Sequence, residues 1–215
     1  MTSSSCRDSG QAFPVYIAVI AALLFLAFAY FVVGQAGATR NSAQTAADAA
    51  VLAAAEDARA QLRDGWLGVV LDPGQWDGFL TGTAYDGSSA CEQAAVFAAK
   101  NGGVFHDVGC VSLAGQHGFR VTVRTEESVG LPGTEPRHAV ASAKALIEPK
   151  CSFTAPEEPE PEETEPDPDP TEPEEDPEPI TGLTCGDMPW TIDPEDPELP
   201  SVVDLFTVRL AGDDE

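Results

Sequence analysis

Positive charge is scarce in this chain, and that scarcity excludes one broad class of function. The 215 residues include 11 Lys and Arg against 36 Asp and Glu, which gives a formal net charge of −25. Nucleic-acid binding requires a basic face that contacts phosphates. We therefore expect no nucleic-acid partner.

Sequence motifs for catalysis and metal binding are also missing. The chain has no G-x-S-x-G, P-loop, H-E-x-x-H, G-x-G-x-x-G or C-x-x-C pattern, and its three histidines are scattered. His106 precedes Asp107, but neighbouring side chains on a strand point to opposite faces. We expect no enzyme, no cofactor and no metal. The alternatives are a zinc site or a Cys–His nucleophile assembled from distant residues.

The five cysteines are divided unequally by a long apolar run. Cys6 precedes the run, and four cysteines follow it: Cys91, Cys110, Cys151 and Cys185. An even number in one oxidising compartment suits two disulfides. The sequence leaves three pairings open. A Cys91–Cys110 bond would join a predicted helix to a predicted strand, and a Cys151–Cys185 bond would turn the segment between them into a tethered loop.

The apolar run has the length of a membrane span. Val15–Val33 contains 19 uncharged residues, and a helix of that length covers about 28 Å, close to the hydrocarbon thickness of a bilayer. Tyr16 and Tyr30 lie near its ends, where aromatic rings favour the interface. We expect a single-pass protein of the cell membrane, with its N-terminus inside and its C-terminal domain extracytoplasmic.

A cleaved signal peptide is the alternative interpretation of the same run. Ala36-Gly37-Ala38 has the small-x-small form that a signal peptidase accepts, which would make Thr39 the first mature residue. A secretion signal usually has an apolar region of about 7–15 residues, however, and this run is longer. The length favours an anchor.

The helix is predicted to continue beyond the apolar run. Ser42–Leu62 has no Gly or Pro and is about half alanine, the best helix former, and Gly65 offers a stop. Gly34, Ala38 and Ser42 repeat at four-residue spacing, and the alanines extend this small-residue seam. Such seams let helix backbones approach closely. The seam predicts helix–helix packing with partners. The alternative is that the alanines only favour helix formation and contact no partner.

The N-terminal region resembles TadG-like and TadE-like pilus-assembly proteins of the Flp, or tight-adherence, system. The resemblance rests on Gly10–Pro14, the apolar run, Thr39–Asn41 and the block Gln44–Ala53, QTAADAAVLA. It implies a structural or assembly protein of a Flp/type IVb pilus-like system. The implied partners are the membrane and other pilus-assembly or pilin-like subunits.

The resemblance also bears on processing at Gly10 and Gln11. Type IV prepilins are cut after a glycine just before the apolar run, and Gly10 occupies that place. The family's glutamate five residues into the mature chain is replaced here by Val15. The resemblance therefore favours the uncleaved, TadG-like anchors.

The middle of the chain reads as a small α+β unit. Ser89–Lys100 predicts a short helix with a capping box at Ser89 and Glu92. Phe119–Thr125, FRVTVRT, predicts a strand whose Phe and Val side chains share one face. Val108–Leu113 predicts another strand.

Three further segments complete the middle and end of the chain. Trp66–Gly87 reads as turns and loops. Ala139–Ile147 fits a strand or a helix, and so does Val202–Leu210.

An acidic, proline-rich tract follows the α+β unit. Residues 155–179 are almost wholly Glu, Asp, Pro and Thr, so they cannot form a core. Proline and like charges extend such a tract, which favours a spacer over a folded site for divalent cations.

The predicted fold class is α+β: a long N-terminal transmembrane helix that continues into a small pilin-like helix-plus-antiparallel-sheet unit, followed by a disordered acidic segment. The predicted divisions are residues 1–13, 14–64, 65–152, 153–181 and 182–215. The alternative function is a membrane-tethered extracytoplasmic binding module that uses the acidic tract as a spacer and is unrelated to pili.

Overall fold

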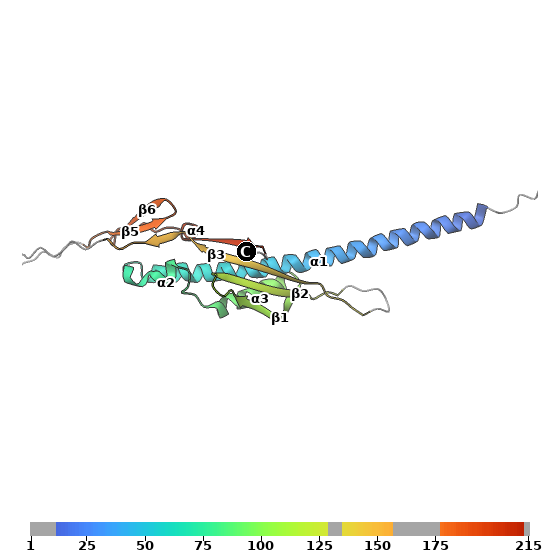
Figure 1. Cartoon of the computed structure of the whole chain (residues 1–215), viewed down its shortest axis with the longest axis horizontal. Coiled ribbons are helices and arrows are strands. Elements are labelled where there is room, and N and C mark those ends of the chain that lie inside the picture. The colour runs from blue at the N-terminus through green and yellow to red at the C-terminus, as the bar shows by residue number, and fades with distance from the viewer. Residues whose placement is uncertain (1–11, 129–134, 157–176, 213–215) are drawn as a thin grey trace, which may run out of the picture.

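The computed structural model describes residues 12–128, 135–156 and 177–212. Its dominant element is one helix of 57 residues, α1 (Ala12–Gly68), which is about 85 Å long at 1.5 Å per residue. The N-terminal half of α1 projects alone, and its C-terminal half lies within the folded domain (Figure 1). The predicted continuous helix is therefore confirmed.

The helix does not end at Gly65, as the sequence suggested. It continues to Gly68, and Trp66 is fully buried in the domain. A Cβ at Gly65 would lie 2.3 Å from Cε1 of Phe79, so this glycine permits close packing instead of ending the helix. The prediction was wrong because a glycine required for close approach looks the same in sequence as a C-cap glycine.

Short helical segments follow α1, so Trp66–Gly87 is not only turns and loops. They are the 3₁₀ turn η1 (Pro73–Gln75) and the one-turn helix α2 (Asp77–Leu80). Trp76, between them, is buried and stacks edge-on against Trp66, with ring centroids 5.5 Å apart. This aromatic pair holds the end of α1 against the chain that follows it.

Helix α3 (Gly87–Lys100) occupies the predicted position but has a different N-cap. The cap is Asp86, whose carboxylate accepts a hydrogen bond of 2.8 Å from the Ser88 backbone N–H. Ser89 instead directs its hydroxyl to Asp57 of α1, at 3.3 Å. The Ser89–Glu92 capping box was therefore wrong, because two overlapping cap signals compete and tertiary contact decides between them.

Four antiparallel strands form the main sheet, in the order β1-β2-β3-β7. They are β1 (Gly103–Ser112), β2 (Gly118–Thr125), β3 (Val140–Pro149) and β7 (Phe206–Ala211). On β2, Phe119, Val121 and Val123 are fully buried, which confirms the alternation read from the sequence. The 139–147 segment, left open between strand and helix, is a strand.

Strand β1 is longer than predicted and irregular. Its register with β2 shifts between Phe105 and Cys110, where Asp107 has φ 50°. The bulge brings His106 Nε2 within 3.5 Å of Asp107 Oδ2, although an undistorted strand would point these side chains apart. Both side chains are partly exposed at the sheet edge. The extra residues disrupt the period of two, which is why the sequence showed only part of the strand.

A second sheet extends the first along the helix axis. It contains β4 (Cys151–Phe153), β5 (Ile180–Cys185) and β6 (Met188–Ile192), in that order. These strands lie at the end of the molecule opposite the exposed part of α1 (Figure 1). The predicted disordered tract falls largely on residues 157–176, which lie outside the described residues.

The C-terminal segment contains both structures that the sequence allowed for it. Helix α4 (Val202–Leu205) is capped by a box between Ser201 and Asp204, and β7 follows directly. Hydrogen bonds from the Ser201 hydroxyl and backbone N–H lower the pKa of Asp204. Strand β7 then pairs with β3 as an edge strand of the main sheet.

Two disulfides connect the elements. Cys91 of α3 is bonded to Cys110 of β1, and Cys151 of β4 is bonded to Cys185 of β5, its cross-strand partner. The first bond fastens the helix to the sheet. The second closes the chain between residues 151 and 185 into a loop.

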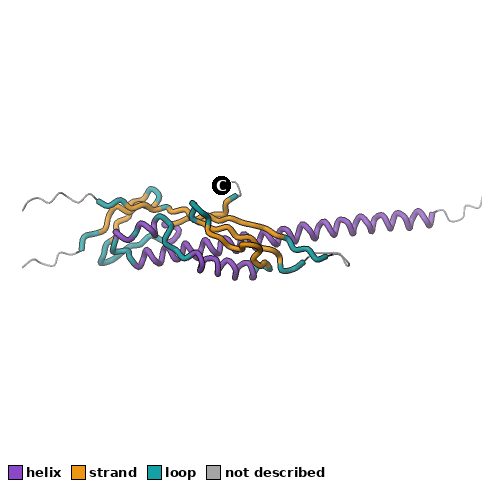
Figure 2. The backbone as a smooth tube through the Cα atoms, turned by 60° about the horizontal axis from the view of Figure 1, so that its bottom comes forward, coloured by secondary structure: helices purple, strands orange, loops and turns teal. Residues whose placement is uncertain are grey.

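The core lies where the second half of α1 meets α3 and the sheet. Helix α1 packs mainly against α3, β3 and β2, and Figure 2 shows the strands running alongside it. The fold is therefore α+β: a long apolar N-terminal helix and a small antiparallel-sheet domain built around its other half.

Candidate functional site

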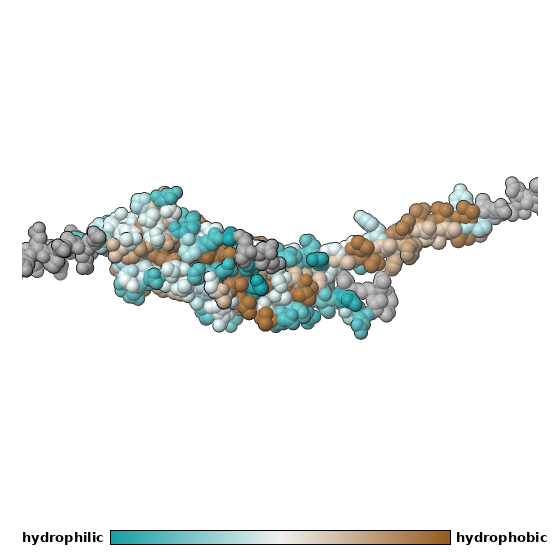
Figure 3. Space-filling model, viewed as in Figure 1, coloured by the Kyte–Doolittle hydropathy of each residue, from teal (hydrophilic) through white to brown (hydrophobic). Residues whose placement is uncertain are grey.

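The projecting half of α1 has an apolar surface without a protein partner among the described residues. Apart from Val32, its large apolar side chains from Phe13 to Val33 are half or more exposed, and Tyr30 reaches 83%. Figure 3 shows this part of the helix as a mostly hydrophobic surface. Among the described helices, α1 is long and apolar enough to cross a membrane. Such a surface is stable in lipid and unfavourable in water.

Between the apolar run and the domain, α1 presents a bare small-residue face. Gly34, Ala38 and Ser42 are all exposed there, and no atom lies within 4 Å of a Cβ built on Gly34. At 3.6 residues per turn, these three positions lie within about 80° of one another around the helix. The backbone is therefore accessible to a neighbouring helix along this face.

The alanines further along α1 are used differently from what the sequence suggested. Ala46, Ala50 and Ala54 are fully buried in the core of the domain itself. Around the helix axis they lie about 80°, 120° and 160° from Ala38, so they turn progressively away from the exposed face. Most of the alanine-rich stretch thus provides close packing within one chain and does not extend the exposed seam.

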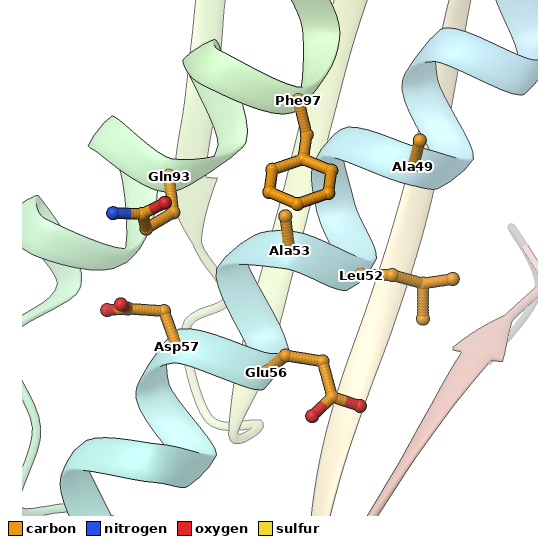
Figure 4. Close-up of a pocket in the computed structure, with 7 residues that line it drawn as sticks. All are labelled: Ala49, Leu52, Ala53, Glu56, Asp57, Gln93 and Phe97. Carbon is orange, nitrogen blue, oxygen red and sulfur yellow. The ribbon is translucent and has the colours of Figure 1, made fainter. Parts of the chain in front are cut away.

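A different set of residues does continue the exposed face. Ala49 and Ala53 lie within about 60° of Ala38 around the helix, and both line a groove between α1 and α3. The groove has a volume of about 510 Å³, and Phe97 of α3 points towards Ala53 across it (Figure 4). The small-residue face therefore leads from the end of the apolar run into an apolar groove on the domain.

Both acidic side chains that border this groove are already engaged. Asp57 accepts a hydrogen bond of 2.6 Å from Gln61 Nε2, and Glu56 forms an ion pair with Arg59. The ammonium of Lys100 lies 4.6 Å from the centre of the Phe97 ring. These interactions leave the apolar floor and the exposed Gln93 as the accessible parts of the groove.

The start of the small-residue face has its own neighbour in the domain. Ala38 and Ser42 line a cleft of about 360 Å³ with Gly102 and with Glu126 and Glu127, which directly follow β2. A helix that lies along the face would pass these two carboxylates. A basic side chain at that level of the partner would complement them.

The remaining candidate residues are distributed as follows. Gly10 and Gln11 lie outside the described residues. All four C-terminal cysteines are in disulfides, so none of them is a free nucleophile. Within the described ranges, no three His, Cys, Asp or Glu side chains form a group that could hold a metal. The groove was not anticipated. Helical periodicity shows on which face of its own helix Phe97 lies, but it does not show which other helix that face contacts.

Comparison with known proteins identifies a family that the N-terminal region resembles. Residues 10–60 match the family model for TadE/G-like proteins of Flp pilus assembly. No curated protein and no solved structure matches the chain. The matched region covers the apolar run, the small-residue face and the groove residues Ala49 and Ala53. Residues 10–60 are therefore similar to the TadE/G-like proteins of Flp pilus assembly, and this similarity together with the apolar helix supports a pilus-related membrane protein.

Proposed function

We propose that this protein is a single-pass, membrane-anchored assembly subunit of a Flp/type IVb pilus-like system. Its N-terminus lies inside the cell, and its disulfide-bonded domain is extracytoplasmic. Its action is structural: α1 packs against helices of other pilus-assembly or pilin-like subunits along the face that contains Gly34, Ala38 and Ser42. The protein has no catalytic role in this proposal.

The observation that carries the proposal is the continuity of this face. It begins one residue after the apolar run and reaches Ala53 in the groove, about 28 Å further along the helix. Lipid can cover the face only near the membrane, because the groove lies on the folded domain. A partner helix can cover both parts at once, and close approach at small residues supplies the packing contacts.

Site-specific photocrosslinking in cells tests this arrangement. A benzophenone amino acid at Ala38 should give crosslinks to pilus-assembly subunits. The same probe at Ala36, which is also exposed but lies about 160° away around α1, is the matched control and should give few. Gly34→Leu should weaken the Ala38 crosslinks, because its side chain would hold the partner backbone away.

Equal crosslinking from Ala36 and Ala38 would contradict a specific face. Crosslinks only to proteins unrelated to pili would support the membrane-tethered binding module instead.

The anchor and its orientation need a separate measurement. N-terminal sequencing of the membrane-extracted protein should give a start at Met1 or Thr2. A start at Gln11 would indicate a processed pilin-like subunit, and a start at Thr39 would exclude the anchor. Protease added outside spheroplasts should digest the C-terminal domain if the proposed orientation is right.

A further inference from the structure

A second cleft lies beside α1 at the point where the helix enters the domain. Gly37, Arg40, Asn41 and Gln44 of α1 line it, together with the first residues of β3, Val140–Ser142. Its volume is about 550 Å³. Around the axis of α1, the mean direction of the four α1 residues that line this cleft differs from that of Ala38 by about 110°. The cleft is therefore separate from the proposed assembly face.

The cleft contains a cation and a hydrogen-bond donor that the protein leaves unused. The Arg40 and Asn41 side chains make no hydrogen bond or ion pair within the part of the chain that the structure describes. Gln44, by contrast, donates to Asp48 Oδ1 at 2.7 Å and to the Ser142 carbonyl at 3.5 Å. No atom lies within 4 Å of a Cβ built on Gly37, so the approach to Arg40 is open.

Arg40 lies just beyond the headgroup layer of a bilayer if the apolar run spans the hydrocarbon core. Arg40 follows Val33 by seven residues, or about 10 Å along the helix, and the headgroup region occupies roughly 5–8 Å beyond the hydrocarbon. Helical side chains tilt towards the helix N-terminus, which here is the membrane side. The guanidinium can therefore reach back to the level of lipid phosphates.

Acidic groups of the domain oppose binding to an anionic surface. Glu126 and Glu127 lie at a similar height along α1, in the cleft lined by Ala38 and Ser42, but on roughly the opposite side of the helix from Arg40. Physiological salt screens charges beyond about 8 Å. Asp48, the nearest acidic residue along this side of α1, is about 12 Å further from the membrane along the helix and already accepts the Gln44 bond.

We propose that this cleft binds the phosphate of a phospholipid headgroup. Arg40 supplies the charge and Asn41 donates a hydrogen bond, while the exposed Val140 forms an apolar wall of the cleft. Binding would fix the height and tilt of α1 at the membrane surface. It does not require a partner helix, so it can fail or succeed independently of the assembly role.

Native mass spectrometry of the full-length protein in neutral detergent tests the site. The probes are phosphatidylglycerol, diacylglycerol, which has no phosphate, and inorganic phosphate. We expect retention of phosphatidylglycerol only. Arg40→Gln should weaken retention roughly fivefold or more, as expected for loss of one cationic contact at a membrane surface. Arg40→Lys should retain most of the binding.

Two further variants separate the cleft from general charge effects. Gly37→Leu keeps Arg40 but fills the open space, and it should also weaken retention. Arg63→Gln removes the same charge from the far end of α1, where Arg63 pairs with Asp64, and it should have no effect. Equal losses in Arg40→Gln and Arg63→Gln would overturn the site. Diacylglycerol retained as well as phosphatidylglycerol would overturn the role of phosphate, and inorganic phosphate bound as tightly as the lipid would overturn the lipid assignment.

Discussion

The two halves of α1 belong to one continuous helix but have different surroundings. The first half presents large side chains such as Leu24 and Phe25, which are more than 60% exposed. The second half is rich in alanine, and Ala46, Ala50 and Ala54 are fully buried. Large apolar side chains suit contact with fluid lipid, whereas alanine lets α3 and the sheet approach the helix closely.

This difference shows that a run of small residues does not identify its partner. In the second half of α1, most alanines face the protein's own core, and only a narrow strip that includes Ala49 and Ala53 remains for others. The surface available for assembly is therefore the part of the small-residue pattern that the domain leaves uncovered. Substitutions in the lipid-exposed half or in the domain half of α1 can test whether the two halves have these different roles.

A charge in the first half should have the largest effect. Leu23→Asp places a carboxylate near the middle of the apolar run and should disfavour membrane insertion by about 3 kcal/mol. Membrane fractionation should show more protein in the soluble or degraded fractions. Ala60→Asp, at an exposed position in the second half, is the control and should leave the protein in the membrane. Normal membrane retention of Leu23→Asp would contradict a lipid-embedded helix.

Removing the bond between α3 and β1 should loosen the second half alone. The double variant Cys91→Ala/Cys110→Ala opens a link with a sequence separation of 19, and the chain-entropy model predicts a loss of about 3 kcal/mol. Hydrogen exchange should increase around Ala46–Ala58, while membrane retention stays unchanged. Unaltered exchange there would mean that the disulfide does not support the core around α1.

Overpacking the second half should have a smaller effect on stability. Ala54→Leu adds bulk at a fully buried position and should destabilise the domain by about 1–3 kcal/mol. Ala60→Leu makes the same change at an exposed position and should stay within about 0.5 kcal/mol of the parent. Urea unfolding of the full-length protein in detergent measures both. Equal stability of the two variants would show that the alanines do not define the packing distance.

The smallest effect concerns the cap of α3, which packs beside the second half of α1. Asp86→Ala should cost about 1 kcal/mol, because it removes the side-chain acceptor for the Ser88 N–H. Glu92→Ala changes the residue that the sequence nominated for a capping box, and it should have almost no effect. The same urea experiment compares them. A larger loss of stability in Glu92→Ala than in Asp86→Ala would support the capping box at Ser89 and Glu92 and contradict Asp86 as the cap.

Local rules predicted the elements whose signals are unambiguous. The apolar run and the alanine-rich stretch predicted one helix, and FRVTVRT predicted a strand with Phe119, Val121 and Val123 on its buried face. Local rules failed where the same residue type fits two different structures or where a bulge interrupts the pattern. Gly65 looked like a helix stop but permits contact with Phe79, and the bulge around Asp107 concealed half of β1.

The candidate site was only partly accessible to sequence reasoning. Gly34, Ala38 and Ser42 were visible because their four-residue spacing is a local property. The groove with Phe97 and the cleft beside Arg40 were not, since each combines residues of α1 with residues at least 36 positions away in the chain. Such pairings depend on how the sheet and α3 are placed, which no local pattern specifies.

The sequence by itself determined the long helix, its lipid-compatible half and the resemblance of residues 10–60 to pilus-assembly proteins, because these depend on composition and on spacing along one helix. Only the tertiary structure decided which alanines are buried, which cysteines are bonded and where the grooves lie. The physical reason is that burial is a property of pairs of surfaces. A helix defines several faces at once, and the rest of the fold selects which of them remain exposed.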